Sequence, residues 1–443
     1  MDAKGYSERE QRSWYAYDWA NSAFSATVVT VFLGPWLTSI TKAAADANGY
    51  VHPFGIPIEA GSYYPYLISL SVFSQVFALP VLGALADYAQ AKKQFMGFFA
   101  YIGAFATMAM FFLTGTRYLL GGALFLIANL SFGASIVFYN AFLPEIAPPE
   151  DRDAVSSKGF AWGYMGGGLL LALNMVMAFK PEAIGLTTGQ AIRLSIASAG
   201  LWWALFTVIP MLGIRNRRAA KHLPPGSTYL TIGFQQLSHT LKGIRRYPQT
   251  LLFLVAYLLY NDGIQTVISL ASQFGQEELH LTIGTLTSAV LMVQFVAFGG
   301  ALLFNKVASA VGSKKAVMGS LVIWTLTLVY VYLAVNSAAQ FYVLAAIIGV
   351  IMGGSQALSR SIYAQMIPPG REAEYFSLYE VSDRGTSWMG PLAFGLALQF
   401  THSYRIAILS LIVFFILGLF LLARVDIVRA AAEAEGQQAG TAA

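Results

Sequence analysis

Acidic side chains interrupt two of the long apolar stretches of the sequence, and an amide side chain follows each of them three residues later. The polar residues concerned are Asp18 and Asn21 in the first stretch, and Tyr260, Asn261, Asp262 and Gln265 in the second. Side chains three positions apart in a helix lie on neighbouring turns of one side. A carboxylate and an amide placed together in this way can bind an ammonium group or carry a proton.

Each acidic residue has two interpretations. Asp262 either lines a path across the protein, where it binds a substrate ammonium or a proton, or it hydrogen-bonds to a neighbouring helix and only holds the packing. Asp18 lies six residues after Arg12, which is about 9 Å along a helix axis. This short distance places Asp18 near one end of its helix and not at the middle. It either takes part in substrate binding or coupling, or forms a gate or a contact between two halves of the chain.

Charged residues near the ends of other apolar stretches are typical of a gate. They are Asp87, Lys92, Lys158, Arg360, Glu380, Asp383 and Arg384. Glu380 and Arg384 are four residues apart, so they can form an ion pair on one helix. Arg360 and Lys158 have a second interpretation, because a basic group can bind a substrate carboxylate, which arginine does with two parallel hydrogen bonds. A third is that these long side chains merely extend from a helix end into water.

Uncharged side chains complete the set of candidates. They are Trp162, Tyr164 and Gln356, followed by Gln294, Tyr139 and Asn140. Each of them either lines a cavity or packs between helices. Gly159, Gly163 and Gly167 recur every four residues, and small residues at this spacing let another helix approach closely. For these glycines we expect a packing role.

The composition indicates which elements must position these residues. Only 11% of the 443 residues are charged and 56% are hydrophobic, whereas about 25% of the residues of a soluble domain are charged. The 31 Phe, 23 Tyr and 8 Trp exclude a solvated disordered chain. The net charge of +5 does not indicate nucleic-acid binding, because the charges fall between apolar runs. We therefore expect an integral membrane protein.

Twelve apolar stretches are long enough to cross a bilayer as helices of about 20 residues. They cover residues 14–40, 63–87, 94–114, 118–142, 157–179, 191–213, 249–272, 284–308, 316–336, 339–363, 375–400 and 403–423. If the N-terminus is cytoplasmic, the opposite side keeps only Lys42, Arg117, Lys180, Arg193 and Arg405 among the basic residues near the span ends. Cytoplasmic loops carry the excess of Lys and Arg. We expect both termini in the cytoplasm and the protein in the plasma (inner) membrane.

The spans form two sets of six. We expect an N-terminal bundle over residues 1–214, a cytoplasmic linker over 215–247, a C-terminal bundle over 248–423 and a disordered cytoplasmic tail over 424–443. The linker has one apolar helical face, which predicts an amphipathic helix on the inner leaflet or an ordinary linker helix. This face comprises Leu230, Phe234, Leu237, Leu241 and Ile244.

The two halves of the chain resemble each other. The matching segments are Gly133-Ala134-Ser135 and Gly353-Gly354-Ser355, Pro148-Pro149 and Pro368-Pro369, Lys158-Gly159-x-x-Trp162 and Arg384-Gly385-x-x-Trp388, and Asp18-x-x-Asn21 and Asp262-x-x-Gln265. Related halves of six helices are typical of transporters whose halves rock about a central site.

Four longer runs combine polar, glycine and aromatic residues. They are Tyr17-Asp18-Trp19-Ala20-Asn21-Ser22-Ala23-Phe24, the run from Ser157 to Gly167, Tyr260-Asn261-Asp262-Gly263, and the run from Gly353 to Ser361. These runs resemble the vacuole effluxer branch of the major facilitator superfamily. The segment from Gly83 to Lys93 is similar to the superfamily's short cytoplasmic loop motif, but Gln90 and Ala91 stand where that motif has Gly and a basic residue.

The resemblance implies an all-α integral membrane fold of twelve transmembrane helices in two pseudo-symmetric six-helix bundles. It also implies a secondary transporter, with amino acids as the best-known cargo of the branch. We therefore expect a secondary active transporter that moves a small polar solute, either amino acids or small peptides, by alternating access, with proton coupling through Asp262 or Asp18. The alternatives are a drug, sugar or lipid-like cargo, which the aromatic spans favour, and a transporter-like receptor without transport.

Enzyme chemistry finds no support in the sequence. The five His are scattered, there is no Cys, and neither a metal-ligand spacing nor a nucleophile or nucleotide motif occurs. We expect no catalytic residues, metal or cofactor. The expected partners are a small-molecule substrate, membrane lipid and protons, with no nucleic acid, and the expected oligomeric state is a monomer.

Overall fold

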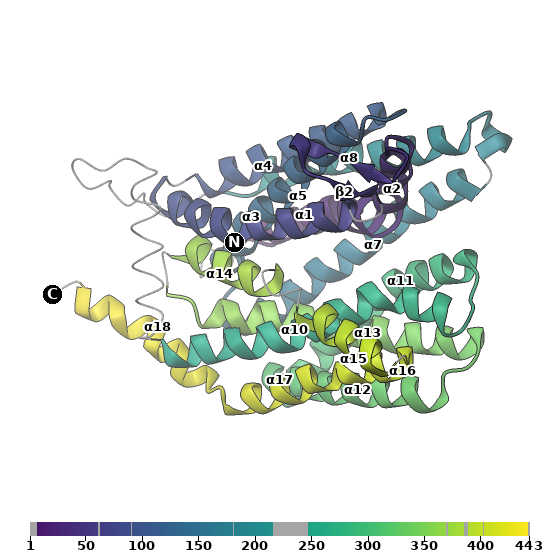
Figure 1. Cartoon of the computed structure of the whole chain (residues 1–443). Coiled ribbons are helices and arrows are strands. Elements are labelled where there is room, and N and C mark those ends of the chain that lie inside the picture. Colours follow the sequence, from purple (N-terminus) through teal and green to yellow (C-terminus); the bar gives the residue numbers. More distant parts are fainter. Residues whose placement is uncertain are drawn as a thin grey trace.

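The computed structural model describes residues 7–60, 63–89, 91–179, 181–215, 247–368, 371–384, 389–401 and 403–441. These residues form almost only helices, which are arranged as two bundles lying side by side (Figure 1). The all-helical architecture of two bundles that the sequence predicted is confirmed.

The first bundle begins with one continuous helix from Glu8 to Ala43. Within it, α1 (Glu8–Ala23) passes into the π-helical stretch η1 (Phe24–Phe32) and then into α2 (Leu33–Ala43). A small hairpin of β1 (Tyr50–Val51) and β2 (Ile58–Glu59) follows, with η2 (Pro53–Gly55) between its strands. The remaining elements are α3 (Tyr63–Ala89), α4 (Lys92–Ala109), η4 (Met110–Phe112), α5 (Tyr118–Ala141), α6 (Leu143–Ile146), η5 (Pro149–Asp151), α7 (Arg152–Phe179), η6 (Pro181–Ile184) and α8 (Thr188–Gly213).

The second bundle contains α10 (Pro248–Glu277), α11 (Ile283–Val311), α12 (Ser313–Ala334), α13 (Ala338–Gln365), α14 (Glu372–Arg384), α15 (Met389–Thr401), α16 (Tyr404–Ser410) and α17 (Ile412–Arg424). Among the described residues, 11 helical stretches are long and apolar enough to cross a membrane. The remaining predicted span, 375–400, corresponds to α14 and α15, which lie on either side of residues 385–388. Those four residues are outside the described part of the chain.

The chain end differs from the prediction. Residues 427–441 form a helix, α18 (Ile427–Thr441), so the disordered tail predicted over 424–443 is wrong for these residues. Alanine is the strongest helix former, and the Asp426 carboxylate caps the helix by accepting the backbone N–H of Arg429 at 3.0 Å. The buried side chains of Ala430 and Ala434 lie on the side of α18 that faces the bundle. The predicted linker helix lies in residues 216–246, outside the described residues.

Glycines bring α7 against α1, as their spacing predicted. A Cβ atom added at Gly163 would lie 2.8 Å from Oγ of Ser22, and one at Gly167 would lie 3.0 Å from the carbonyl oxygen of Ser22. Both distances are shorter than an ordinary van der Waals contact. The two helices can approach this closely only because these positions carry no side chain. The close approach also fixes the position of the α1 residues that face the second bundle.

The two bundles touch along two sets of helices. One is α7 against α11 and α13, and the other is α3 and α5 against α14, which lies next to the first bundle in Figure 1. The end of α8, the start of α10 and helix α18 share one end of the molecule. We call this the linker end, and the opposite one the far end.

Candidate functional site

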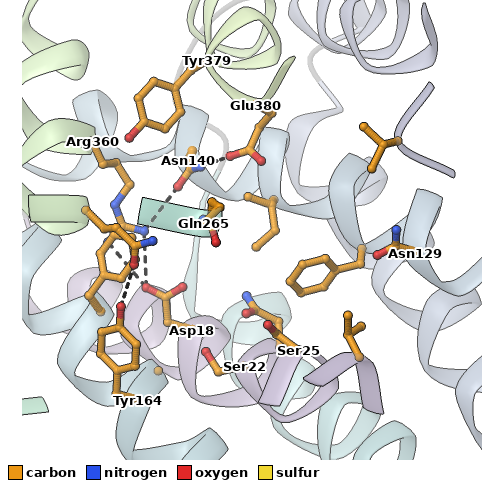
Figure 2. A pocket seen from close by; sticks show the side chains of 18 of the residues that line it. Asp18, Ser22, Ser25, Asn129, Asn140, Tyr164, Gln265, Arg360, Tyr379 and Glu380 are labelled. Carbon is orange, nitrogen blue, oxygen red and sulfur yellow. Dashed lines mark hydrogen bonds and ion pairs between the residues drawn. The ribbon is translucent and has the colours of Figure 1, made fainter. Parts of the chain in front are cut away.

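A cavity of about 420 Å³ lies between the two bundles, within the range of about 300–1,000 Å³ usual for small-molecule sites. Its polar lining residues are Asp18, Asn21, Ser22, Ser25, Asn129, Asn140, Tyr164, Tyr257, Gln265, Ser269, Gln356, Arg360, Tyr379 and Glu380 (Figure 2). They come from α1, η1, α5 and α7 of the first bundle and from α10, α13 and α14 of the second. Apolar side chains such as Phe132 and Ile136 fill the wall between them.

Arg360 of α13 is the central cation of this cavity, and it reaches across to the first bundle. Its Nε donates to Oγ of Ser156 at 2.9 Å, and its Nη2 donates to the carbonyl oxygen of the same residue at 2.9 Å. Its Nη1 donates to Oδ1 of Asn140 at 3.3 Å and lies 3.4 Å from Oδ2 of Asp18. One guanidinium therefore joins α13 to α1, α5 and α7.

Aromatic rings enclose this guanidinium. Its Cζ atom lies 4.1 Å from the ring centroid of Phe160, 4.7 Å from that of Trp14 and 5.6 Å from that of Tyr139. A cation over an aromatic face is attracted by the ring quadrupole, and the attraction is larger where water is excluded. The rings thus offset part of the cost of burying a positive charge between the bundles.

The Asp18 carboxylate is held firmly by one neighbour and loosely by another. The hydroxyl of Tyr139 donates to its Oδ2 at 2.6 Å. Arg360 contacts the same oxygen at 3.4 Å and 3.5 Å, whereas charge-assisted N–H···O bonds usually measure about 2.7–2.9 Å. Because the ion pair is long and lies at the cavity wall, a ligand in the cavity can reach either member.

Two further hydrogen bonds join the bundles at the cavity. Nδ2 of Asn140 donates to Oε1 of Glu380 at 2.9 Å, while Oδ1 of Asn140 accepts from Arg360. The hydroxyl of Tyr164 donates to Oε1 of Gln356 at 2.6 Å. The cavity therefore offers two carboxylates, one guanidinium and neutral hydrogen-bonding groups, all within one interface.

Polar contacts between the bundles continue toward the linker end. The buried Lys92 ammonium at the start of α4 lies 2.9 Å from Glu145 of its own bundle and 2.9 Å from Glu372 of the other. The Ser313 hydroxyl donates to the Asp153 carboxylate, which joins α12 to α7. These contacts lie on the linker-end side of the cavity and join the two bundles there.

The structure brings eight of the predicted residues to the cavity. They are Asp18, Asn21, Asn140, Tyr164, Gln265, Gln356, Arg360 and Glu380. Lys92, predicted as a gating residue, lies in the ion-pair cluster toward the linker end.

Asp262 lies elsewhere, although the sequence paired it with Gln265. Its Oδ2 accepts the backbone N–H of Gly390 at 2.6 Å, which belongs to the first turn of α15. The first N–H groups of a helix have no partner within the helix, and a carboxylate there also complements the helix dipole. The geometry is that of a helix cap and favours the second of the two interpretations, a contact that holds neighbouring helices together.

The other predicted residues also lie outside the cavity. Tyr260 is buried in the second bundle and shares a 2.6 Å hydrogen bond with Ser359, and Asn261 is buried beside it. Trp162 is 48% exposed on the outer face of α7, and Lys158 is exposed as well. The side chains of three predicted gating residues are outside the described part of the structure. They are Asp87, Asp383 and Arg384.

Some residues of the site were not singled out in the sequence. Glu145 and Glu372 lie just beyond the predicted spans, so only their tertiary contact with Lys92 reveals them. Asn129 does carry a sequence signal, because it is an amide inside the apolar span 118–142. Ser156 carries none, since a serine near a helix start is ordinary.

Comparison with known proteins decides the family. Residues 6–435 match a family model described as "Vacuole effluxer Atg22 like". The chain belongs to this family. The resemblance that the sequence motifs carried is thus confirmed over nearly the whole chain.

Relatives in the Atg22-like family include bacterial and fungal proteins. The chain is 31% identical over 418 residues to an uncharacterized MFS-type transporter, YxiO, of Bacillus subtilis (strain 168), with 94% of each chain covered. It is 26% identical over 546 aligned residues to Autophagy-related protein 22-1 of Penicillium rubens, which covers 96% of this chain and 91% of that protein.

Solved structures share the fold at low identity. The fucose:proton symporter FucP of E. coli superimposes with a TM-score of 0.69 at 13% identity, covering 94% of this chain and 98% of that one. A bacterial homologue of the iron transporter ferroportin in an outward-facing state gives 0.67 at 14% identity, covering 94% and 99%. The chain has the twelve-helix fold of the major facilitator superfamily. Its family and fold are those of secondary transporters, which are not enzymes.

Proposed function

We propose that this Atg22-like protein moves small zwitterionic solutes, amino acids or short peptides, across the membrane by alternating access. The observation that carries the proposal is the pairing of Arg360 with Asp18 at a cavity shared by both bundles. A zwitterion carries one carboxylate and one ammonium group, and the cavity holds one guanidinium and two carboxylates.

The chemistry of binding follows from these groups. A substrate carboxylate takes up the donors of Arg360, and arginine suits this task because its planar fork matches a carboxylate. The substrate ammonium lies against Glu380, the second carboxylate of the cavity. The 3.4 Å contact between Asp18 and Arg360 is long enough that substrate can replace it without breaking a strong bond.

Proton coupling fits the same arrangement. While Arg360 stays beside it, the Asp18 carboxylate is stabilised by a positive charge. A substrate carboxylate that engages Arg360 weakens this stabilisation, and a lone carboxylate in a membrane interior is costly. Asp18 then takes up a proton together with the substrate, which couples the two.

Alternating access requires that contacts between the bundles open and close. The protein lies in the inner membrane with both termini in the cytoplasm, so the linker end is the cytoplasmic end. The ion pair of Lys92 with Glu372 holds the bundles together at that end, which corresponds to an outward-facing state. Substrate enters from the far end, and the Lys92 contacts open when the bundles rock. The working unit is a monomer, because the cavity is complete within one chain.

Uptake into proteoliposomes tests this function. The purified chain is reconstituted, and uptake of radiolabelled amino acids and dipeptides is measured with and without an inward proton gradient. Arg360→Lys is expected to lower uptake at least tenfold while keeping the charge, and Lys158→Arg, at an exposed site, serves as the matched control. Uptake only of sugars or of bulky amphiphiles would refute the zwitterion proposal, and binding without accumulation would indicate a receptor.

A further inference from the structure

Asn129 lines the cavity from α5, well away from the charged residues. In Figure 2 it lies on the opposite side of the pocket from Arg360. Asn140, which accepts a hydrogen bond from Arg360, is 11 residues further along the same helix, about 16 Å at the helical rise of 1.5 Å per residue. The cavity therefore has a charged pole at Arg360 and a neutral polar pole at Asn129.

A buried hydrogen-bonded cluster positions Asn129. Its Nδ2 donates to Oγ of Ser71 on α3 at 2.7 Å, and Nε2 of Gln75 donates to the same hydroxyl at 3.3 Å. Ser71 and Gln75 are each 1% exposed. Because Nδ2 is engaged in this way, the amide of Asn129 offers its Oδ1 to the cavity. This oxygen is a hydrogen-bond acceptor.

The cluster also holds a polar atom whose bonding capacity is not met. Oε1 of Gln75 is buried and has no hydrogen-bond partner among the described residues. Turning the amide of Gln75 by 180° would let Ser71 donate to Oε1 but would leave Nε2 unpaired. A buried unpaired polar atom is unfavourable. If this cluster served only to pack the helices together, we would expect apolar side chains here and not a buried unpaired polar atom.

We propose that Asn129, positioned by Ser71 and Gln75, is a specificity subsite that accepts a hydrogen bond from a neutral donor at the distal end of the substrate. The inference rests on the proposed function and narrows its substrate class to zwitterions with a hydroxyl or amide N–H remote from the charged end. An extended chain spans about 3.3–3.6 Å per residue, so a dipeptide with a polar second side chain reaches further toward Asn129 than a free amino acid.

Matched pairs of compounds test the subsite in proteoliposomes of the full chain. The pairs are tyrosine with phenylalanine, and alanyl-tyrosine with alanyl-phenylalanine, each pair differing by one hydroxyl. In at least one pair the hydroxyl-bearing member is expected to bind about tenfold more tightly, as one net hydrogen bond provides. Asn129→Leu is expected to abolish this preference.

The test uses a matched control variant and a second variant of the same subsite. Asn174 of α7 is also a buried asparagine of the first bundle, bonded to Ser195 and Ser198 and absent from the cavity lining. Asn174→Leu is therefore expected to keep the preference. If Asn129→Leu does not fold, Ser71→Ala carries the test, with an expected two- to threefold loss of preference because the amide is no longer held.

The outcomes separate the subsite from the proposed function. Equal affinity within both pairs in the unaltered protein, or a preference that survives in Asn129→Leu, overturns the subsite and leaves the zwitterionic cargo standing. Failure of all four compounds to bind overturns the proposed amino-acid and peptide cargo, and the subsite with it.

Discussion

Asp18 and Arg360 face each other inside the molecule, where a charge without a partner is unfavourable. The side chain of Arg360 is 3% exposed and that of Asp18 is 10% exposed. Removing one member of a buried ion pair usually costs about 3–5 kcal/mol, because the other charge is left uncompensated. An exposed pair contributes much less, because water screens its charges. The pair Asp46–His52, with side chains 40% and 51% exposed, is exposed in this way.

Asp18→Asn is therefore expected to lower the free energy of unfolding by about 3 kcal/mol, and adding Arg360→Gln should recover most of the loss. The measurement is thermal unfolding of the detergent-purified protein for the two single variants and the double variant. Asp46→Asn is the matched control and is expected to change stability far less, because water screens this exposed pair. Equal effects of Asp18→Asn and Asp46→Asn would show that the Asp18–Arg360 contact carries no buried charge pair.

Sequence reasoning identified Asp18, Arg360 and Glu380 because charges are rare in apolar spans. It could not predict that Asn140 links Arg360 to Glu380, since that link depends on how α5, α13 and α14 meet across the interface. The sequence also could not predict which neighbouring element the Asp262 side chain contacts. Asp262 and Gln265 lie on one side of α10, yet Gln265 reaches the cavity while Asp262 meets the start of α15.

At the scale of the elements, the contact between α10 and α15 has a clear physical function. The Asp262 carboxylate accepts a backbone N–H of the first turn of α15. We expect Asp262→Asn to keep transport and its pH dependence, because an amide oxygen also accepts this bond. Asp262→Leu removes the acceptor and should destabilise the protein by about 1–2 kcal/mol, as the loss of a helix cap does.

Proteoliposome uptake across a pH series, together with thermal unfolding, tests both Asp262 variants. A large loss of uptake in Asp262→Asn with unchanged stability would contradict the capping role and restore Asp262 as a proton or substrate site. Because the asparagine variant keeps the shape and the hydrogen-bond acceptor, it isolates the charge from the packing.

Element boundaries were predictable where hydrophobicity decides them. Spans such as 118–142 and 284–308 agree with α5 and α11 within a few residues. The prediction failed at α18, because the Ala- and Glu-rich end has little hydrophobic signal and its helix depends on intrinsic propensity and on packing by Ala430 and Ala434. The π-helical η1 within the first span was not predicted either, since π-helix is rare and its residues read as an ordinary apolar span.

At the scale of the whole molecule, polar contacts join the bundles at the cavity and on its linker-end side. Lys92 bridges the bundles through Glu372, and Ser313 through Asp153. A transporter that rocks must break both contacts in each cycle. Ligands shift such an equilibrium only by their differential affinity for the two states, so the strength of these contacts sets how readily the linker end opens.

The contact between Ser313 and Asp153 allows a direct test of rocking, because the chain has no Cys of its own. Asp153→Cys combined with Ser313→Cys is expected to form a disulfide under mild oxidation, to lose at least 90% of uptake, and to regain it on reduction. Adding Glu372→Gln weakens the Lys92 bridge and should lower the crosslinked fraction, since the linker end is then open for longer. Gel mobility and uptake measure the two effects.

The matched control joins helices that belong to one bundle. Asn174→Cys with Ser198→Cys links α7 to α8 at an existing contact of 3.1 Å. Its crosslinking should leave uptake nearly unchanged and should not respond to Glu372→Gln, because no motion between the bundles is restrained. If the Asp153–Ser313 disulfide forms fully and uptake persists, the bundles do not separate at the linker end, and substrate must leave the cavity by another route.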